Sequence, residues 1–190
     1  MQWVLNTYAP IPLPPGCFLI ADDAVSSGLQ SRTQILSALN RLVTQQGLDI
    51  HTFELKKHDS GKPYGLLDGK AIGVSVSHCR SMLICATHTG GEVGVDVEPC
   101  DRNLHPRLRD RICHPDEMPE LSEELSCIRM WTVKEAVLKY LGTGLRMAMN
   151  KIKLDVTGDH QFLAIMDQGS VLVNSFKFRD HWIAVATQTS

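Results

Sequence analysis

The sequence predicts an α+β fold made of two similar halves. In each half, apolar residues at three- and four-residue spacing indicate one helix, over residues 27–46 and again over 122–141. Short apolar runs bounded by Gly, Pro, Asn or Asp accompany both helices and indicate strands. We therefore expect each half to be a helix packed on a small antiparallel sheet.

The first half opens with a strand and a stretch rich in proline. The prolines that follow the first strand exclude regular helix there, because proline lacks the backbone N–H that a helix needs. Gly47 is well placed to cap the helix that precedes it. The expected strands cover 3–8, 16–21, 52–55, 71–77 and 82–87.

The second half begins near an acidic strand that Pro99 closes. Gly142 follows the second helix and predicts where that helix ends, because glycine readily adopts the left-handed conformation of a C-cap. The remaining expected strands cover 152–154, 162–166, 171–178 and 182–186.

The acidic strand carries two carboxylates on one face. Because strand side chains alternate, the valines at 93, 95 and 97 point to one side, and Asp96 and Glu98 point to the other. The two acids stand roughly 6.6 Å apart along the strand. Carboxylates this close raise each other's pKa or recruit a cation, and their hard oxygens suit Mg²⁺.

The second helix holds Glu135 and Lys139 one turn apart. On their own, these two residues fit an ordinary surface ion pair, which contributes roughly 0.2–0.5 kcal/mol to a helix. With Asp96 and Glu98, Glu135 would complete a set of three carboxylates for one metal ion. Zinc is the weaker alternative, because Cys113-His114 and His78-Cys79 match no zinc-binding spacing.

Composition excludes several partners. The chain has 190 residues and a net charge of -2, and it lacks the basic runs that bind nucleic acid or an anionic membrane surface. The six scattered cysteines form no disulfide framework, and the N-terminus lacks the features of a signal peptide. We therefore expect a cytoplasmic protein that binds neither nucleic acid nor membranes.

Several short motifs together resemble one protein family. Gly94-Val-Asp-Val-Glu98 and Trp131-Thr-x-Lys-Glu-x-x-x-Lys139 are similar to the signature of the 4′-phosphopantetheinyl transferases. Gly61-Lys62-Pro63, Ser75-Val76-Ser77-His78 and Gly142-x-Gly144-Leu145 fit the longer, single-chain class of that family, in the family's order.

The resemblance implies a pseudo-dimer with the 4′-phosphopantetheinyl transferase fold. Residues 1–95 would form the N-terminal half and residues 96–190 the C-terminal half, with the active site in the cleft between them. A monomer is expected, because the larger class contains both halves in one chain.

The resemblance also assigns site residues. Asp96, Glu98 and Glu135 would hold Mg²⁺, and Asp96, Glu135 and Lys139 would be catalytic. Coenzyme A would be bound along its length, with Arg32 and Thr33 near the nucleotide end, Lys62 at the adenine and phosphates, and basic groups at the pyrophosphate. The predicted residues that bind coenzyme A are Arg32, Thr33, Lys62, Ser77, His78, Lys134 and Lys139.

The implied activity is that of a holo-[acyl-carrier-protein] synthase type transferase. It would move the phosphopantetheine arm of coenzyme A to a serine of an apo acyl, peptidyl or aryl carrier protein and release 3′,5′-ADP. Either Glu135 or a metal-bound water would accept the serine proton. Two alternatives stay open: a non-catalytic member that binds coenzyme A or a carrier protein, and a Mg²⁺-dependent phosphohydrolase that uses the same carboxylates.

Overall fold

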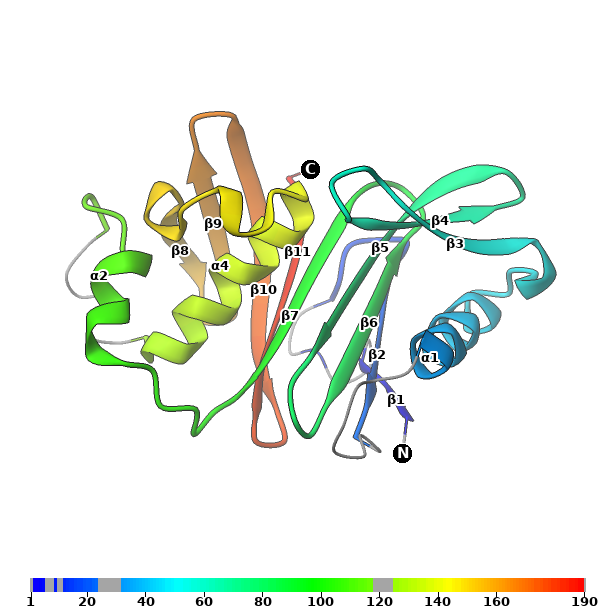
Figure 1. Cartoon of the computed structure of the whole chain (residues 1–190), viewed down its shortest axis with the longest axis horizontal. Coiled ribbons are helices and arrows are strands. Elements are labelled where there is room, and N and C mark those ends of the chain that lie inside the picture. Colours follow the sequence, from blue (N-terminus) through cyan, green and yellow to red (C-terminus); the bar gives the residue numbers. More distant parts are fainter. Residues whose placement is uncertain (1, 6–8, 10–11, 24–31, 118–124, 190) are drawn as a thin grey trace.

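Two antiparallel sheets lie between two helices in the computed structural model of the chain (Figure 1). The structure describes residues 2–5, 9, 12–23, 32–117 and 125–189. Apolar side chains from both sheets, such as Ile84, Val95 and Ile183, form one shared buried cluster. Each sheet uses its other face to pack against a helix, so the layers run helix, sheet, sheet, helix.

The N-terminal sheet has six strands in the order β1-β2-β6-β5-β4-β3. Helix α1 (Arg32–Gln45) covers its outer face, where Leu39 and Leu42 pack with Ile20 and Leu83. The strands are β1 (Gln2–Val4), β2 (Cys17–Asp22), β3 (Phe53–Lys57), β4 (Pro63–Leu67), β5 (Lys70–His78) and β6 (Leu83–His88), with η2 (Ile50–Thr52) before β3.

The C-terminal sheet has five strands in the order β7-β11-β10-β9-β8. Helix α4 covers its outer face and buries Val133, Val137 and neighbouring residues there. The elements are β7 (Val93–Pro99), η3 (Pro106–Leu108), α2 (Arg109–Ile112), α4 (Cys127–Leu141), η4 (Gly144–Arg146), η5 (Met149–Lys151), β8 (Lys153–Gly158), β9 (Gln161–Met166), β10 (Gly169–Phe178) and β11 (His181–Gln188).

Gly94 lets α4 lie directly on β7. A Cβ atom at this position would stand 2.1 Å from the Ala136 carbonyl oxygen and 2.3 Å from the Tyr140 nitrogen, which real Cβ atoms do not approach. Only glycine therefore permits this spacing of helix and strand. The contact brings the acidic face of β7 against the helix turn that carries Glu135 and Lys139.

The structure confirms the predicted fold class, with two similar α+β halves. Gly142 adopts the left-handed conformation (φ 69°) and caps α4, as predicted. Helix α4 begins at Cys127, with Ser126 as its N-cap, and not at residue 122 as predicted, whereas α1 is described from Arg32 onwards. Residues 27–31 and 122–124 of the predicted helices lie outside the described residues, as do residues 6–8 of the first strand.

Strand β4 was not predicted, because Pro63 and Gly65 in five residues are more typical of a turn. The predicted division between residues 95 and 96 lies inside β7, which pairs along its length with β11. That division stays a prediction. In the described parts of the chain, no helix has the length and apolar character needed to span a bilayer.

Candidate active site

Ser77, Asp96 and Lys139 meet where the two halves join. The Lys139 Nζ donates to Asp96 Oδ1 at 2.8 Å and to Ser77 Oγ at 2.7 Å. Ser77 Oγ in turn donates to the same Asp96 oxygen at 2.7 Å. These residues come from β5, β7 and α4, so one hydrogen-bonded cluster draws on both halves of the chain.

Strand β7 is fixed against β5 by a second serine. The backbone N–H of Val95 donates to Ser75 Oγ at 3.0 Å, although the two strands belong to different sheets. Both serine side chains are buried, so their hydroxyls satisfy polar groups that the protein interior would otherwise leave unpaired. Ser75 and Ser77 thereby set the position of the acidic strand.

Asp96 keeps one oxygen without a partner. Its side chain is only 6% exposed, and its Oδ2 is buried and accepts no hydrogen bond. An unpaired buried carboxylate oxygen is costly, and a hard divalent cation such as Mg²⁺ is a ligand that would satisfy it. The residues at this position therefore fit a metal ion.

Glu98 lies two residues after Asp96 on the same face of β7, and it is hydrogen-bonded to Arg102. Its Oε1 accepts a hydrogen bond from Arg102 Nη1, and the guanidinium also lies 5.8 Å from the centre of the Trp131 ring. Burial raises the pKa of the Glu98 carboxyl, which the Arg102 hydrogen bond opposes and the neighbouring Asp96 reinforces.

Glu135 faces these two carboxylates from α4. Burial raises the pKa of Glu135, and the negative charges of Asp96 and Glu98 raise it further, while Lys139 and Arg102 act against them. The three acids therefore interact electrostatically. Among the described residues, however, no three Cys, His, Asp or Glu side chains come close enough to form a ready metal site.

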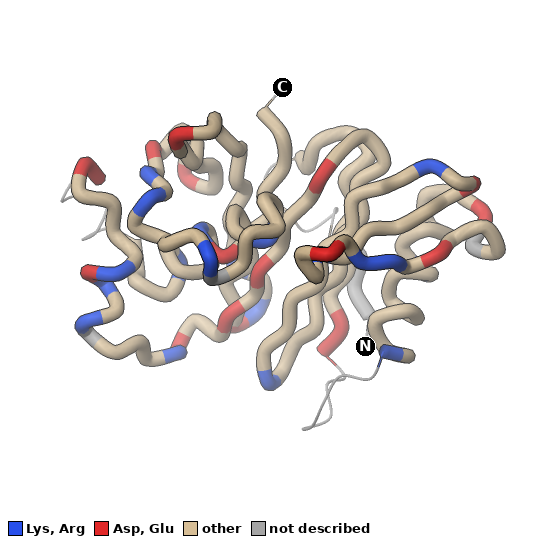
Figure 2. Tube along the Cα trace, turned by 45° about the horizontal axis from the view of Figure 1, so that its top comes forward, with Lys and Arg blue, Asp and Glu red and all other residues tan. Residues whose placement is uncertain are grey.

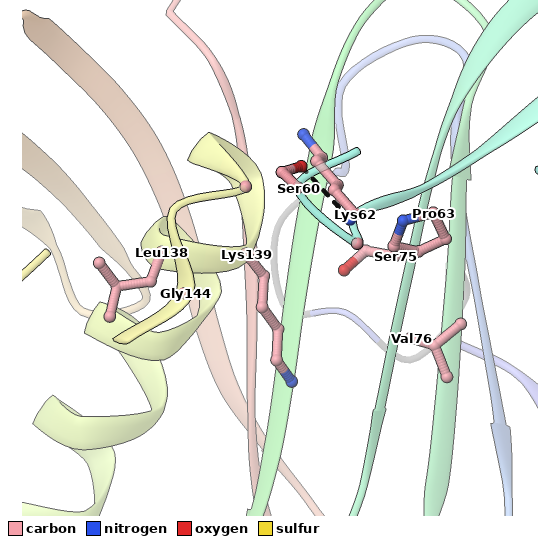
Figure 3. Close-up of a pocket in the computed structure, with 10 residues that line it drawn as sticks. Ser60, Lys62, Pro63, Ser75, Val76, Leu138, Lys139 and Gly144 are labelled. Carbon is pink, nitrogen blue, oxygen red and sulfur yellow. Dashed lines mark hydrogen bonds between the residues drawn. The ribbon is translucent and has the colours of Figure 1, made fainter. Parts of the chain in front are cut away.

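A pocket of about 230 Å³ opens beside Lys139. Its walls come from the loop before β4, from β5 and from the end of α4, and Figure 3 shows Lys139 and Lys62 on opposite sides. Lys62 donates to the Glu92 carboxylate and to the Tyr140 carbonyl oxygen. Its stem lies against Gly142, where a Cβ would stand 2.9 Å from Lys62 Cδ.

Lys134 points into the core and not into this pocket. It is completely buried, and its Nζ lies 2.6 Å from Glu117 Oε1 and 2.6 Å from the Ile112 carbonyl oxygen. Glu117 also accepts the backbone N–H groups of His114 and Leu154. The structure thus separates Lys134 from the other predicted ligands of coenzyme A.

The remaining predicted residues lie at the margins. His78 ends β5 directly after Ser77 and is exposed. Arg32 and Thr33 are exposed at the start of α1, which covers the face of its sheet that points away from β7. Neither Arg32 nor Thr33 is bonded to the Asp96 cluster in the part of the chain that the structure describes.

Sequence reasoning missed Arg102, Glu117 and His181, and it gave no role to Ser75. Arg102 follows Glu98 at a four-residue interval, which was a usable signal once a turn at Pro99 was assumed. His181 carried no such signal: its Nε2 lies 2.7 Å from Ser81 Oγ, and the two are 100 residues apart in sequence. Glu117 likewise meets its lysine only through the fold.

A basic segment follows β7 in the chain. Figure 2 shows Lys and Arg positions recurring in the segment that carries α2. Arg107, Arg109 and Arg111 are exposed there, and His105 and Arg107 line a groove of about 600 Å³ together with Leu108, Asp110 and Arg111. The groove presents more basic than acidic side chains, which suits an acidic partner.

Comparison with known proteins identifies the family of this chain. Residues 92–186, half of the chain, match the sequence pattern of the 4′-phosphopantetheinyl transferase superfamily. The chain is also similar to "4′-phosphopantetheinyl transferase gsp" of Aneurinibacillus migulanus, with 26% identity over 106 residues. That alignment covers 53% of this chain and 43% of the relative. The matched segment contains β7 and α4, and the chain belongs to the 4′-phosphopantetheinyl transferase superfamily.

Proposed function

We propose that this protein transfers the 4′-phosphopantetheine arm of coenzyme A to a serine of an apo carrier protein, with release of 3′,5′-ADP. The observation that supports this most directly is the Ser77–Asp96–Lys139 cluster, with Glu98 and Glu135 beside it and a pocket next to Lys139. The similarity to a named transferase of this family supports the same activity.

Asp96, Glu98 and Glu135 are the residues that would hold Mg²⁺. The buried, unpartnered Oδ2 of Asp96 supports this assignment. When bound, the metal ion would neutralise negative charge on the pyrophosphate of coenzyme A. Lys139 would contribute a further positive charge from the protein, and His78 and Lys62 would supply hydrogen-bond donors around the phosphates.

Glu135 is the proposed general base. In the transfer step, the carrier serine oxygen forms a bond to the phosphorus that bears the pantetheine arm, and the bond from that phosphorus to the oxygen of 3′,5′-ADP breaks. The serine proton passes to Glu135. Its raised pKa favours this role, because a stronger base accepts a proton more readily as long as it is ionised at the working pH.

Lys134 has a different proposed role. Its complete burial and its bonds to Glu117 and Ile112 support a structural function, in which it ties the segment after α2 to α4. We therefore assign the pyrophosphate contacts of this helix to Lys139 and not to Lys134.

The proposed partner is an acidic carrier protein of the acyl type, which would make this enzyme a holo-[acyl-carrier-protein] synthase. The exposed arginines around α2 support an acidic partner through charge complementarity. Peptidyl and aryl carrier proteins present the same type of serine and belong in the same test.

Intact mass spectrometry of apo carrier proteins tests the proposal. Each carrier is incubated with this protein, coenzyme A and Mg²⁺, with and without EDTA, and 3′,5′-ADP is measured in parallel. The proposal predicts a mass gain of one phosphopantetheine arm that EDTA suppresses. No gain with coenzyme A binding intact would favour a non-catalytic binder. Hydrolysis of coenzyme A without any carrier would favour a phosphohydrolase.

A further inference from the structure

Arg102 is brought to Glu98 by a turn at the end of β7. The backbone N–H of Arg102 donates to the Pro99 carbonyl oxygen at 3.1 Å, which closes the chain just after the strand. The turn brings the Arg102 guanidinium back to the Glu98 carboxylate, which lies on the same face of β7 as Asp96. The contact is therefore set by local backbone geometry, and it does not depend on a distant element.

The cluster contains more negative than positive groups. Three carboxylates, Asp96, Glu98 and Glu135, are accompanied by the two cations Lys139 and Arg102. Asp96 uses one oxygen for Lys139 and Ser77, and Glu98 uses one for Arg102. Arg102 thus supplies charge compensation where the proposed metal ion would also bind.

The two cations differ in how firmly they are held. Lys139 has two side-chain partners, and its side chain is 30% exposed. Arg102 has a single carboxylate partner and a side chain that is 42% exposed. The Glu98 side chain is only 13% exposed, but the guanidinium is already in contact with water, so water can solvate Arg102 once another cation takes its place at Glu98. Of the two, Arg102 is the cation that can leave.

We propose that Arg102 is a displaceable counter-ion of Glu98, which occupies that carboxylate until a divalent cation takes its place. The inference rests on the metal assignment in the proposed function. The Trp131 ring lies beneath the guanidinium and makes a cation–π contact with it. The fluorescence of Trp131 should therefore change when Arg102 moves away. Metal binding and the environment of Trp131 are therefore coupled.

Metal titration of the full-length protein with coenzyme A, in the absence of a carrier protein, tests this coupling. Binding of Mn²⁺ is measured by electron paramagnetic resonance, and tryptophan emission is followed during titration with Mg²⁺. The emission change should disappear in Trp131→Phe, which separates the signal of Trp131 from those of Trp3 and Trp182.

Arg102→Ala should bind Mn²⁺ about 2- to 5-fold more tightly, the range expected for removing one exposed ion pair. It should also lose most of the Mg²⁺-dependent change in Trp131 emission. Arg107→Ala removes an exposed arginine from the same segment and should match the unmodified protein in both measurements. Thermal unfolding checks that each variant is folded.

Two results would overturn the proposal. Equal or weaker Mn²⁺ binding by Arg102→Ala would show that Arg102 does not compete for Glu98. If Arg102→Ala bound Mn²⁺ more tightly but kept the full change in Trp131 emission, Arg102 would act only through its long-range charge and would not be displaced from Glu98. Failure of transfer to every carrier protein, with these binding results as expected, would instead reject the proposed function and leave the role of Arg102 intact.

Discussion

Two lysines of helix α4 have opposite surroundings although they are five residues apart. Lys134 and Lys139 each contact one carboxylate, Glu117 and Asp96 respectively. Lys134 is completely buried within the C-terminal half and also bonds to a backbone carbonyl. Lys139 is partly exposed and reaches across to Ser77 of the other half.

The difference shows that the contribution of a lysine–carboxylate pair depends on how deeply the pair is buried and on its other contacts, because the residue types are nearly the same in both pairs. At about 100° per residue, positions five apart on a helix point roughly 140° away from each other. One lysine therefore enters the core behind α4, and the other enters the junction of the two sheets. The first is surrounded by the core of the C-terminal half, and we propose that the second contacts the substrate.

Replacing Lys134 should have the largest effect on stability. Lys134→Met leaves Glu117 as a buried carboxylate without its cation, which should lower the free energy of unfolding by about 3–5 kcal/mol. Urea unfolding measures this loss. Transfer assayed well below the melting temperature should remain close to normal, because Lys134 does not face the site.

Lys153→Met is the matched control for that substitution. Lys153 also forms an ion pair, with Asp155 at 3.2 Å, but its side chain is 35% exposed and that of Asp155 is 46% exposed. Its replacement should change the free energy of unfolding by less than about 1 kcal/mol. Equal stability losses in the two variants would refute the distinction between a core lysine and a surface lysine.

The same substitution at Lys139 should mainly affect chemistry. Lys139→Met removes the cation that contacts Asp96 and Ser77, and transfer should fall by about 10²–10³-fold. The free energy of unfolding should fall by only about 1–2 kcal/mol, because water reaches this site. Transfer rates and urea unfolding are measured on the same preparation. A small loss of stability with normal transfer would indicate an ordinary helix ion pair.

Glu135→Gln should stabilise the protein at neutral pH. Burial and the neighbouring acids raise the folded-state pKa of Glu135, so the stability that this carboxyl contributes is present at low pH and is lost as the pH rises through that pKa. The neutral glutamine avoids this loss, and the melting temperature at pH 7 should rise by about 1–3 °C. The advantage should vanish below about pH 4, where both proteins are uncharged at this position.

His181 gives the smallest expected effect. Burial lowers its pKa, and its Nδ1 is buried without a hydrogen-bond partner, so the folded protein resists protonation there. The stability that neutral His181 contributes is present above about pH 6.5 and is lost as the pH falls through the lowered pKa. Between pH 7 and pH 5, the melting temperature of His181→Gln should fall about 1–2 °C less than that of the unmodified protein. Identical pH profiles would rule out this titration.

The sequence was sufficient for the overall architecture and for the face of β7 that carries Asp96. Strand alternation and helix periodicity depend only on local residues, so they identified both features. The sequence could not show that Lys134 is buried and Lys139 is not, because both belong to the same motif and their partners lie elsewhere in the chain. Ser75 was noted only as part of a motif, because its hydrogen bond to Val95 joins two different sheets and leaves no local signal. The roles assigned to the site residues stay predictions.

Asp96→Asn tests the central claim most directly, since Asp96 joins the two halves and keeps the unpartnered oxygen assigned to the metal. Transfer to an apo carrier protein is measured by intact mass over a range of Mg²⁺ concentrations, after the fold has been checked by thermal unfolding. We predict that the transfer rate falls about 10³-fold or more at every Mg²⁺ concentration. The substitution removes a group that would help to stabilise the negative charge that develops on the phosphates in the transition state. A near-normal rate with an unchanged Mg²⁺ requirement would contradict the account of this site.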